Sequence, residues 1–341
     1  ADWTPSNLKS SEYLEGFFEF NIITYSFSVG TYQKFTHYKV QFPSSLSQQY
    51  TRFKLSGNYM LFVFENGDTE KPVFSKRFMV VDSKASIQCS IRQPVSDAKP
   101  GGQQLELTMD LNASSLANVQ RDVYIRVFQN NRWDNVSEHI QPQFVQGNRL
   151  SFQFNKELMF EGGNEYRPLD LRSLRFQSPQ VKKMNRDENQ LMQVELIPDE
   201  SRAIKPYLYY ADINGAFTLY NRDAIDATSV LEADYVNCKF SYKPQEVSKP
   251  VYLIGSWTSA QPKSRIPLYY NSNSGHCEAQ VMLKQGFYNY LFSESNGSLA
   301  ATEGSFWDTE NEYTILVYYR PFGTYFDQII GYAKCNSLKA R

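Results

Sequence analysis

Three histidines are the side chains best suited to acid–base chemistry or metal binding, and none has a suitable partner. His37, His139 and His276 lie far apart, and none has a second ligand at metal-binding spacing. His276 and Cys277 are neighbours on an expected strand, so their side chains point to opposite faces. The chain also lacks the nucleophile-elbow, zinc-protease, phosphate-loop and dinucleotide-binding patterns. Because no acid, base and nucleophile come together, we expect no enzymatic activity, no metal and no cofactor.

Carboxylates gather near the C-terminus, at Glu303, Asp308, Glu310 and Glu312. Carboxylates at alternate positions can bind Ca²⁺, and a pair at a fixed separation across a cleft can cleave glycosides. This run leads straight into an expected strand and gives no sign of a cleft. A solvated loop is therefore the preferred interpretation, with a Ca²⁺ site as the alternative. The glycine-rich stretch EGGNEY at 161–166 follows no strand–helix pattern and is expected to be a loop rather than a phosphate cradle.

The four cysteines are Cys89, Cys238, Cys277 and Cys335, and none of them forms a CxxC pair. This spacing disfavours zinc and thioredoxin-like sites. An even number is compatible with an oxidising compartment. The sequence leaves the pairing open. We prefer Cys238 with Cys277, because both fall within one expected domain.

Charge and hydropathy exclude several partners. The 341 residues include 35 basic and 36 acidic side chains, a formal net charge of −1, so neither nucleic acid nor an anionic membrane surface is expected to bind. The densest apolar stretch, YMLFVF at 59–64, is strand-sized and far too short to span a bilayer. The opening residues ADWTPSN contain no signal-peptide pattern, which is compatible with a secretory signal that has been removed.

Alternation of apolar and polar residues dominates the chain and predicts β-strands. In QLELTMDL (104–111) every second residue from Leu105 to Leu111 is apolar, and DYVNCKFSY (234–242) alternates in the same way. EYTILVYY (312–319) is apolar on both faces, so we expect a central or covered strand. The 24 tyrosines and 24 phenylalanines suit a pleated, half-buried surface.

Turn and helix signals complete the local pattern. Asn214-Gly215, between YLYYAD and AFTLY, is the strongest hairpin signal, because both residues accept the positive φ of a type I′ turn. Helical turns are expected only within SSEYLEGF (10–17) and RDAIDATSVLEADY (222–235).

The strands recur at intervals typical of antiparallel sandwiches. We therefore expect an all-β fold of tandem immunoglobulin-like β-sandwich domains. Breaks in the strand series predict a first sandwich at 1–82, a second at 83–229, a third at 230–335 and a tail at 336–341. The first is short for such a domain and is expected to lack its initial strands.

The third expected domain has the layout of glycan-binding immunoglobulin-like modules. Its stretch 249–292 runs strand, glycine, tryptophan-containing turn, long loop, strand and a Gly-Phe-Tyr strand. In such modules exposed aromatics stack on sugar rings, and Trp257 is the candidate platform. The preferred interpretation is that the layout reflects the fold alone and that Trp257 packs over the sandwich edge. A carbohydrate-binding accessory protein is the alternative function.

Seven phrases, in order along nearly the whole chain, resemble the plug proteins of the type IX secretion system. They are ADWTPSNLKSSEYLEGF (1–17), THYKVQFP (36–43), SGNYMLFVFENGD (56–68), GGNEYRPLDLRSLRF (162–176), ADINGAF (211–217), LKQGFYNYLF (283–292) and EGSFWDTENEYTILVYYRPFGTYFDQIIG (303–331). Each phrase alone is weak, but their ordered set is specific.

The resemblance implies a non-enzymatic periplasmic protein that associates peripherally with the outer membrane and does not insert into it. Members of that family associate with the giant outer-membrane β-barrel translocon and occlude its periplasmic mouth when no substrate is engaged. Reversible sealing requires a modest interface anchored by aromatic and arginine side chains. We expect the third domain and the GGNEY loop to carry much of the contact. The candidate anchors are Trp3, Trp133, Trp257, Trp307, Arg167, Arg172 and Arg175.

Overall fold

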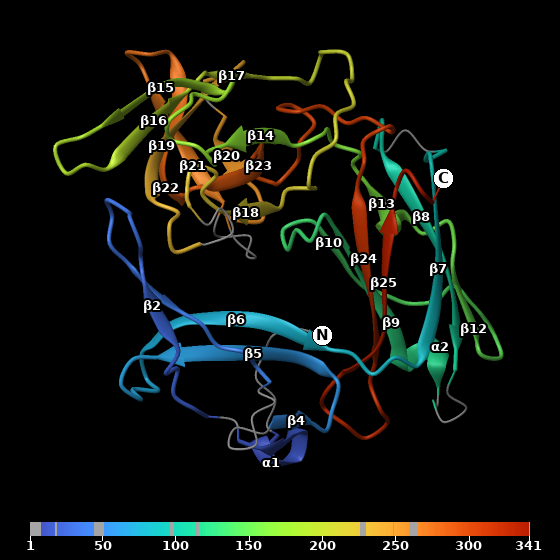
Figure 1. Cartoon of the computed structure of the whole chain (residues 1–341). Helices are drawn as coiled ribbons and strands as arrows, with labels where there is room; N and C mark the ends of the chain where they lie inside the picture. Colours follow the sequence, from blue (N-terminus) through green and yellow to red (C-terminus); the bar gives the residue numbers. More distant parts are fainter. Residues whose placement is uncertain are drawn as a thin grey trace.

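The computed structural model describes residues 8–17, 19–43, 51–95, 99–112, 116, 118–225, 230–247, 249–258 and 265–340. Nearly every regular element in them is a β-strand, which confirms the expected all-β class; the immunoglobulin-like detail stays a prediction. The strands form three units (Figure 1). We call residues 8–82 the first unit, residues 85–160 together with 312–336 the second unit, and residues 167–293 the third unit.

Helices are short wherever the structure describes the chain. They are α1 Ser10–Tyr13, α2 Val119–Asp122 and the 3-10 helix η2 Lys156–Leu158. No helix in these described ranges is long and apolar enough to cross a membrane. The helix α1 confirms the helical turn expected in 10–17. In 222–235 the described residues form turns and the start of a strand but no helix, and 226–229 lie outside the described residues.

The first unit consists of three separate two-stranded antiparallel sheets. They pair β1 Leu14–Gly16 with β4 Thr51–Phe53, β2 Tyr25–Phe27 with β3 Thr36–Tyr38, and β5 Gly57–Phe64 with β6 Pro72–Val80. Asn66 and Gly67 both adopt positive φ in the turn between β5 and β6. Because none of these sheets has a third described strand, the unit depends on its neighbours for stability.

The second unit is built from two antiparallel sheets with a shared apolar core. One contains β7 Ala85–Arg92, β8 Gln103–Leu111, β11 Phe144–Gln146, β12 Arg149–Phe152 and β13 Met159–Phe160. The other has the order β10 Val136–Ile140, β9 Val123–Gln129, β24 Glu312–Tyr319 and β25 Gln328–Asn336. The alternate apolar residues of β8 are buried, as predicted, and β24 lies centrally between β9 and β25, also as predicted.

The cysteine pairing differs from the one we preferred. Cys89 on β7 and Cys335 on β25 form a disulfide that joins the two sheets of the second unit. Cys238 and Cys277 are free and buried. Cys238 lies opposite Val281 in the strand register, four residues from Cys277, which is about 13 Å along the strand. That separation far exceeds the Cα–Cα distance of a disulfide, so the prediction was wrong.

The third unit contains one ten-stranded sheet. Its strands are β14 Arg167–Asp170, β15 Val181–Arg186, β16 Met192–Leu196, β17 Asp199–Glu200, β18 Phe217–Leu219, β19 Tyr235–Lys243, β20 Val251–Ile254, β21 Ile266–Asn271, β22 His276–Lys284 and β23 Gly286–Ser293. Most pairs are antiparallel, but β16 and β17 run parallel to β19. Alternate residues of β19 point into the core, as predicted.

Strand pairing corrects the boundaries expected after residue 82. The strands β14 to β18 precede residue 230 but pair with strands that follow it, whereas β24 returns to pair with β9. Alternation in the sequence indicates where a strand lies, but not which strand it pairs with. Asn214 and Gly215 form the predicted turn with positive φ. Only one arm of the expected hairpin, β18, is a strand, whereas residues 207–213 form no regular secondary structure.

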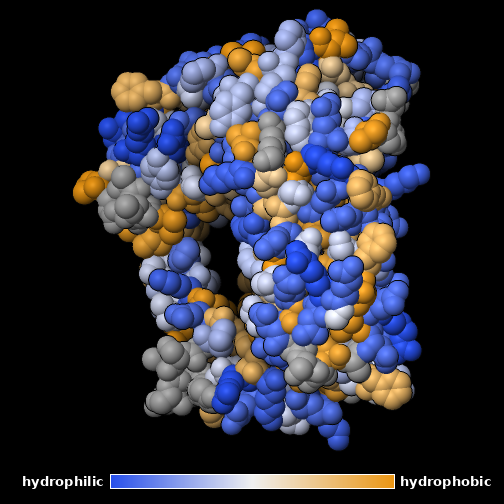
Figure 2. Space-filling view, turned by 90° about the vertical axis from the view of Figure 1, so that its right-hand side faces the viewer, coloured by the Kyte–Doolittle hydropathy of each residue, from blue (hydrophilic) through white to orange (hydrophobic). Residues whose placement is uncertain are grey.

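The three units contact one another in pairs. The Tyr318 hydroxyl of the second unit donates to Asn58 Oδ1 of the first at 3.0 Å. The Arg265 side chain of the third unit pairs with Asp134 of the second at 3.1 Å. The loop 28–35 of the first unit reaches the third, where β2 rises toward it in Figure 1. Figure 2 shows an opening between the side chains of one face in the lower half of the molecule.

Candidate interaction surface

An aromatic groove of about 1670 Å³ lies in the first unit. Phe53, Tyr59 and Phe78 form its floor, with ring centroids 4.8 Å apart for Phe53 and Tyr59 and 5.5 Å for Tyr59 and Phe78. Phe42 contacts Phe78 at 5.8 Å. Burial raises the pKa of Tyr59 to about 12, and the Tyr13 hydroxyl adds to the shift. The groove also borders part of the loop between β24 and β25 of the second unit, so it opens beside the joint between the two units.

The ribbon formed by β2 and β3 exposes an apolar face. Side chains alternate across a strand, so Ile23, Tyr25 and Phe27 share one face with Tyr38 and Val40. All five are exposed, by 41–76%. Tyr25 contacts Phe27 at 5.6 Å and Tyr38 at 6.1 Å between ring centroids. This set of five residues, which we call the ribbon face, is a continuous apolar surface open to solvent.

The first unit buries very little of its own apolar surface. Leu14 is the only buried hydrophobic side chain among its described residues, whereas the second and third units each have a large buried cluster. Soluble proteins seldom leave contiguous aromatic surface in water unless a partner covers it. The ribbon face and the groove are therefore the strongest candidate for a protein-binding surface.

The predicted tryptophan anchors mostly pack inward. The Trp257 indole N–H donates to the Asn289 carbonyl at 2.8 Å, and its ring contacts Phe240 and Tyr288. This is the packed arrangement we preferred for Trp257, and the carbohydrate alternative stays a prediction.

The other three tryptophans have different positions. Trp133 packs edge-on against Phe128, at 4.8 Å between ring centroids, and lies beneath the Arg77 guanidinium at the joint between the first and second units. Trp307 is half-buried against the core of the second unit. Trp3 lies outside the described residues. The structure therefore brings none of the described tryptophans together in one surface.

The predicted arginines also differ in their accessibility. Arg167 is largely buried in an ion cluster. Arg172 is partly buried, pairs with both carboxylate oxygens of Asp170 and donates to the Tyr220 hydroxyl. Arg175 is exposed. That these arginines contact a partner stays a prediction. Of the three, Arg175 has the most exposed side chain.

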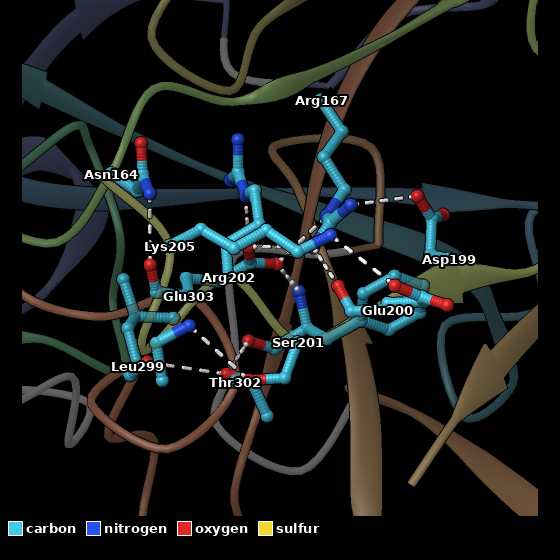
Figure 3. Close-up of polar contacts among 12 residues, drawn as sticks. Asn164, Arg167, Asp199, Glu200, Ser201, Arg202, Lys205, Leu299, Thr302 and Glu303 are labelled. Carbon is cyan, nitrogen blue, oxygen red and sulfur yellow. Dashed lines mark hydrogen bonds and ion pairs between the residues drawn. The ribbon is translucent and has the colours of Figure 1, made fainter. Parts of the chain in front are cut away.

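Glu303 is the centre of a buried ion cluster shown in Figure 3. It accepts hydrogen bonds from Arg167 Nε at 3.1 Å, Arg202 Nε at 2.7 Å and the Phe292 backbone N–H at 2.9 Å. Burial alone would raise the pKa of this carboxyl, but the two guanidinium groups outweigh it and hold the pKa below its usual range. Asp199 also binds Arg167, yet burial raises its pKa.

The burial of these residues corrects two predictions, one about the acidic run that contains Glu303 and one about the GGNEY loop. Glu303 is fully buried rather than part of a solvated loop, and no group of three or more His, Cys, Asp or Glu side chains in the described ranges could hold a metal ion. Asn164, Glu165 and Tyr166 of the GGNEY stretch are buried as well, so that loop offers little surface to a partner. Glu303 contacts Arg167 and Arg202, and Asn164 donates to the Glu303 carbonyl. Each of these contacts joins residues more than 100 positions apart, which the local sequence pattern does not reveal.

Comparisons with known proteins identify the family. The family model described as "Type 9 secretion system plug protein 1st domain" matches residues 1–82. No curated protein matches the chain. A solved structure, the crystal structure of a hypothetical protein from Parabacteroides merdae ATCC 43184 at 2.30 Å resolution, is 31% identical with a TM-score of 0.90, over 98% of this chain and 85% of that chain. Residues 1–82 therefore match the type IX secretion system plug protein family, which confirms the family resemblance expected from the sequence.

Proposed function

We propose that this protein is a non-enzymatic periplasmic plug that reversibly occludes the periplasmic mouth of the type IX outer-membrane β-barrel translocon. The proposal rests on one observation: the same part of the chain matches the plug family and carries the candidate interaction surface. Residues 1–82, which match the plug family, also contain the exposed ribbon face and the aromatic groove. The disulfide between Cys89 and Cys335 supports an oxidising compartment such as the periplasm.

The proposed contact is made by the ribbon face and the rim of the groove. Buried aromatic side chains are the usual anchors of a protein interface, and a polar rim keeps such an interface reversible. The ribbon face supplies the aromatic anchors, whereas Ser26 and His37 lie on the opposite face of the ribbon. Arg175, exposed beside the exposed Phe176, is proposed as a peripheral contact.

The test is a pull-down of the tagged protein from outer membranes solubilised in mild detergent, with mass spectrometry of the partners. We expect the wild type to recover a very large β-barrel protein, and to recover less of it when secretion cargo occupies the barrel. The triple variant Tyr25→Ser/Phe27→Ser/Tyr38→Ser removes three exposed rings and is expected to lose the barrel.

A matched control removes exposed apolar side chains elsewhere. Leu208 and Tyr269 are more exposed than the three substituted ribbon residues but lie in the third unit. The variant Leu208→Ser/Tyr269→Ser should retain the barrel. Equal retention by both variants would refute the proposed surface, and recovery of no barrel by the wild type would refute the plug function itself.

A further inference from the structure

The tip of the ribbon is attached to the third unit by a set of specific contacts. The tip, residues 28–35, lies between β2 and β3. The Val29 backbone N–H donates to the Leu231 carbonyl at 3.0 Å, and the Gln33 side-chain amide donates to the Asn189 carbonyl at 3.3 Å. Thr31, at the centre of the tip, is only 4% exposed. The centre of the tip is therefore buried, although the Val29 and Tyr32 side chains are each 56% exposed.

Asp234 is the main acceptor for this attachment. One carboxylate oxygen accepts the Tyr32 backbone N–H at 2.9 Å, and the other accepts the Gln33 backbone N–H at 3.0 Å. Asp234 is itself buried and precedes β19, where its own N–H donates to Gln285. Hydrogen bonds to an ionised, buried carboxylate are stronger than those between neutral groups. The two amides therefore fix the tip on the third unit.

Two cations hold the aromatic rings of the tip. The Arg186 guanidinium lies 3.6 Å from the Tyr32 ring centroid, and Lys284 Nζ lies 3.6 Å from that of Phe35. Phe35 also contacts Tyr235 edge-on at 5.5 Å. Arg186 ends β15, Tyr235 begins β19 and Lys284 ends β22. All the contacts therefore gather at one end of the neighbouring strands β15, β16, β19 and β22.

The stem of the ribbon lacks comparable support. Its ribbon face is exposed, and among the described strands β2 and β3 pair only with each other. An isolated two-stranded ribbon is marginally stable in water. Its position therefore depends on its two ends, namely the first unit at the base and Asp234 with its neighbours at the tip.

We propose that residues 28–35 form a releasable clasp that holds the first unit against the third. When the tip leaves Asp234, the contact between these two units is lost, while the contacts of the second unit with each of the others stay in place. The first unit then moves relative to the third about its junction with the second. This device operates within the chain itself and does not depend on the proposed plug function.

The test measures the isolated full chain by amide hydrogen exchange and by the distance between two spin labels. Labels at Lys76→Cys on the first unit and Lys243→Cys on the third unit occupy exposed positions, and the native thiols at Cys238 and Cys277 are buried. We expect slow exchange at the Tyr32 and Gln33 amides and a single narrow distance distribution. Asp234→Ala should speed exchange of both amides by about tenfold to a hundredfold and broaden the distances.

Two further variants keep the result interpretable. Tyr32→Ser/Phe35→Ser removes both rings from the clasp and leaves the third unit unchanged. If Asp234→Ala disturbs the start of β19, this double variant still shows whether loss of the clasp contacts changes the distance between the units. Lys34→Ala is the control, because Lys34 Nζ donates to the Thr31 carbonyl within the same loop. It should leave exchange and distance unchanged. Rapid exchange of the two amides in the wild type, or an unchanged distance in both clasp variants, would overturn the proposal.

Discussion

Removing the charge of Glu303 is expected to destabilise the protein strongly. Glu303 is fully buried and is the shared partner of Arg167 and Arg202. Glu303→Gln preserves the shape but leaves two guanidinium groups facing a neutral side chain. Breaking a buried ion pair by removing one partner costs about 3–5 kcal/mol. At about 2–4 °C per kcal/mol, the thermal midpoint should fall by roughly 6–20 °C.

Calorimetry or circular dichroism during heating at neutral pH would measure this change. Glu200→Gln provides a matched control, since Glu200 lies in the same cluster in Figure 3 but pairs with Lys205 at 3.3 Å, with both side chains about half exposed. An exposed pair contributes about 0–1 kcal/mol, so the control should melt within roughly 4 °C of the wild type. If the two variants melt at the same temperature, burial of the cluster does not have the energetic role that we assign to it.

Three further predictions concern stability. Replacing Cys89 and Cys335 by serine should cost about 2–5 kcal/mol, and a reducing agent should lower the melting temperature of the wild type but not of this variant. Burial raises the pKa of Glu165 to about 7, despite hydrogen bonds that oppose the shift, so the folded protein holds a proton that the unfolded chain has released between pH 4.5 and 7. The free energy of unfolding should therefore fall as the pH rises through this window. Urea titrations should show a shallower fall for Glu165→Gln than for the wild type. If the free energies of the two proteins change in parallel with pH, the assignment to Glu165 is contradicted. Trp257→Ala should cost about 3–5 kcal/mol because its ring is packed, whereas Tyr269→Ala, at an exposed ring, should change the unfolding midpoint very little.

The sequence predicted individual strands well because their pattern is local. In 104–111 and 234–242 every second side chain is buried, and 312–319 is covered on both faces. In the ribbon, Ile23, Tyr25 and Phe27 share a face in the same way but remain exposed. Periodicity predicts which residues share a face, but not whether another part of the chain covers that face.

Partners that are distant in the sequence were not predictable in this way. Arg167 and Arg202 meet Glu303 across 136 and 101 residues, and a short acidic run gives no sign of either contact. The disulfide partners are 246 residues apart, so proximity within an expected domain favoured the wrong pair. The clasp went unnoticed for the same reason, since its carboxylate, Asp234, lies about 200 residues from the amides it accepts.

The return of β24 to the second unit determines the order in which a growing chain can finish folding. One edge of β9 pairs with β10, which follows closely, but the other pairs with β24, with Gln129 opposite Tyr313 and 184 residues between their positions. A chain that emerges N-terminus first therefore presents an unpaired, apolar strand edge throughout the synthesis of the entire third unit. Such an edge invites pairing with other chains and slows folding. The second unit begins before the third but is completed after it.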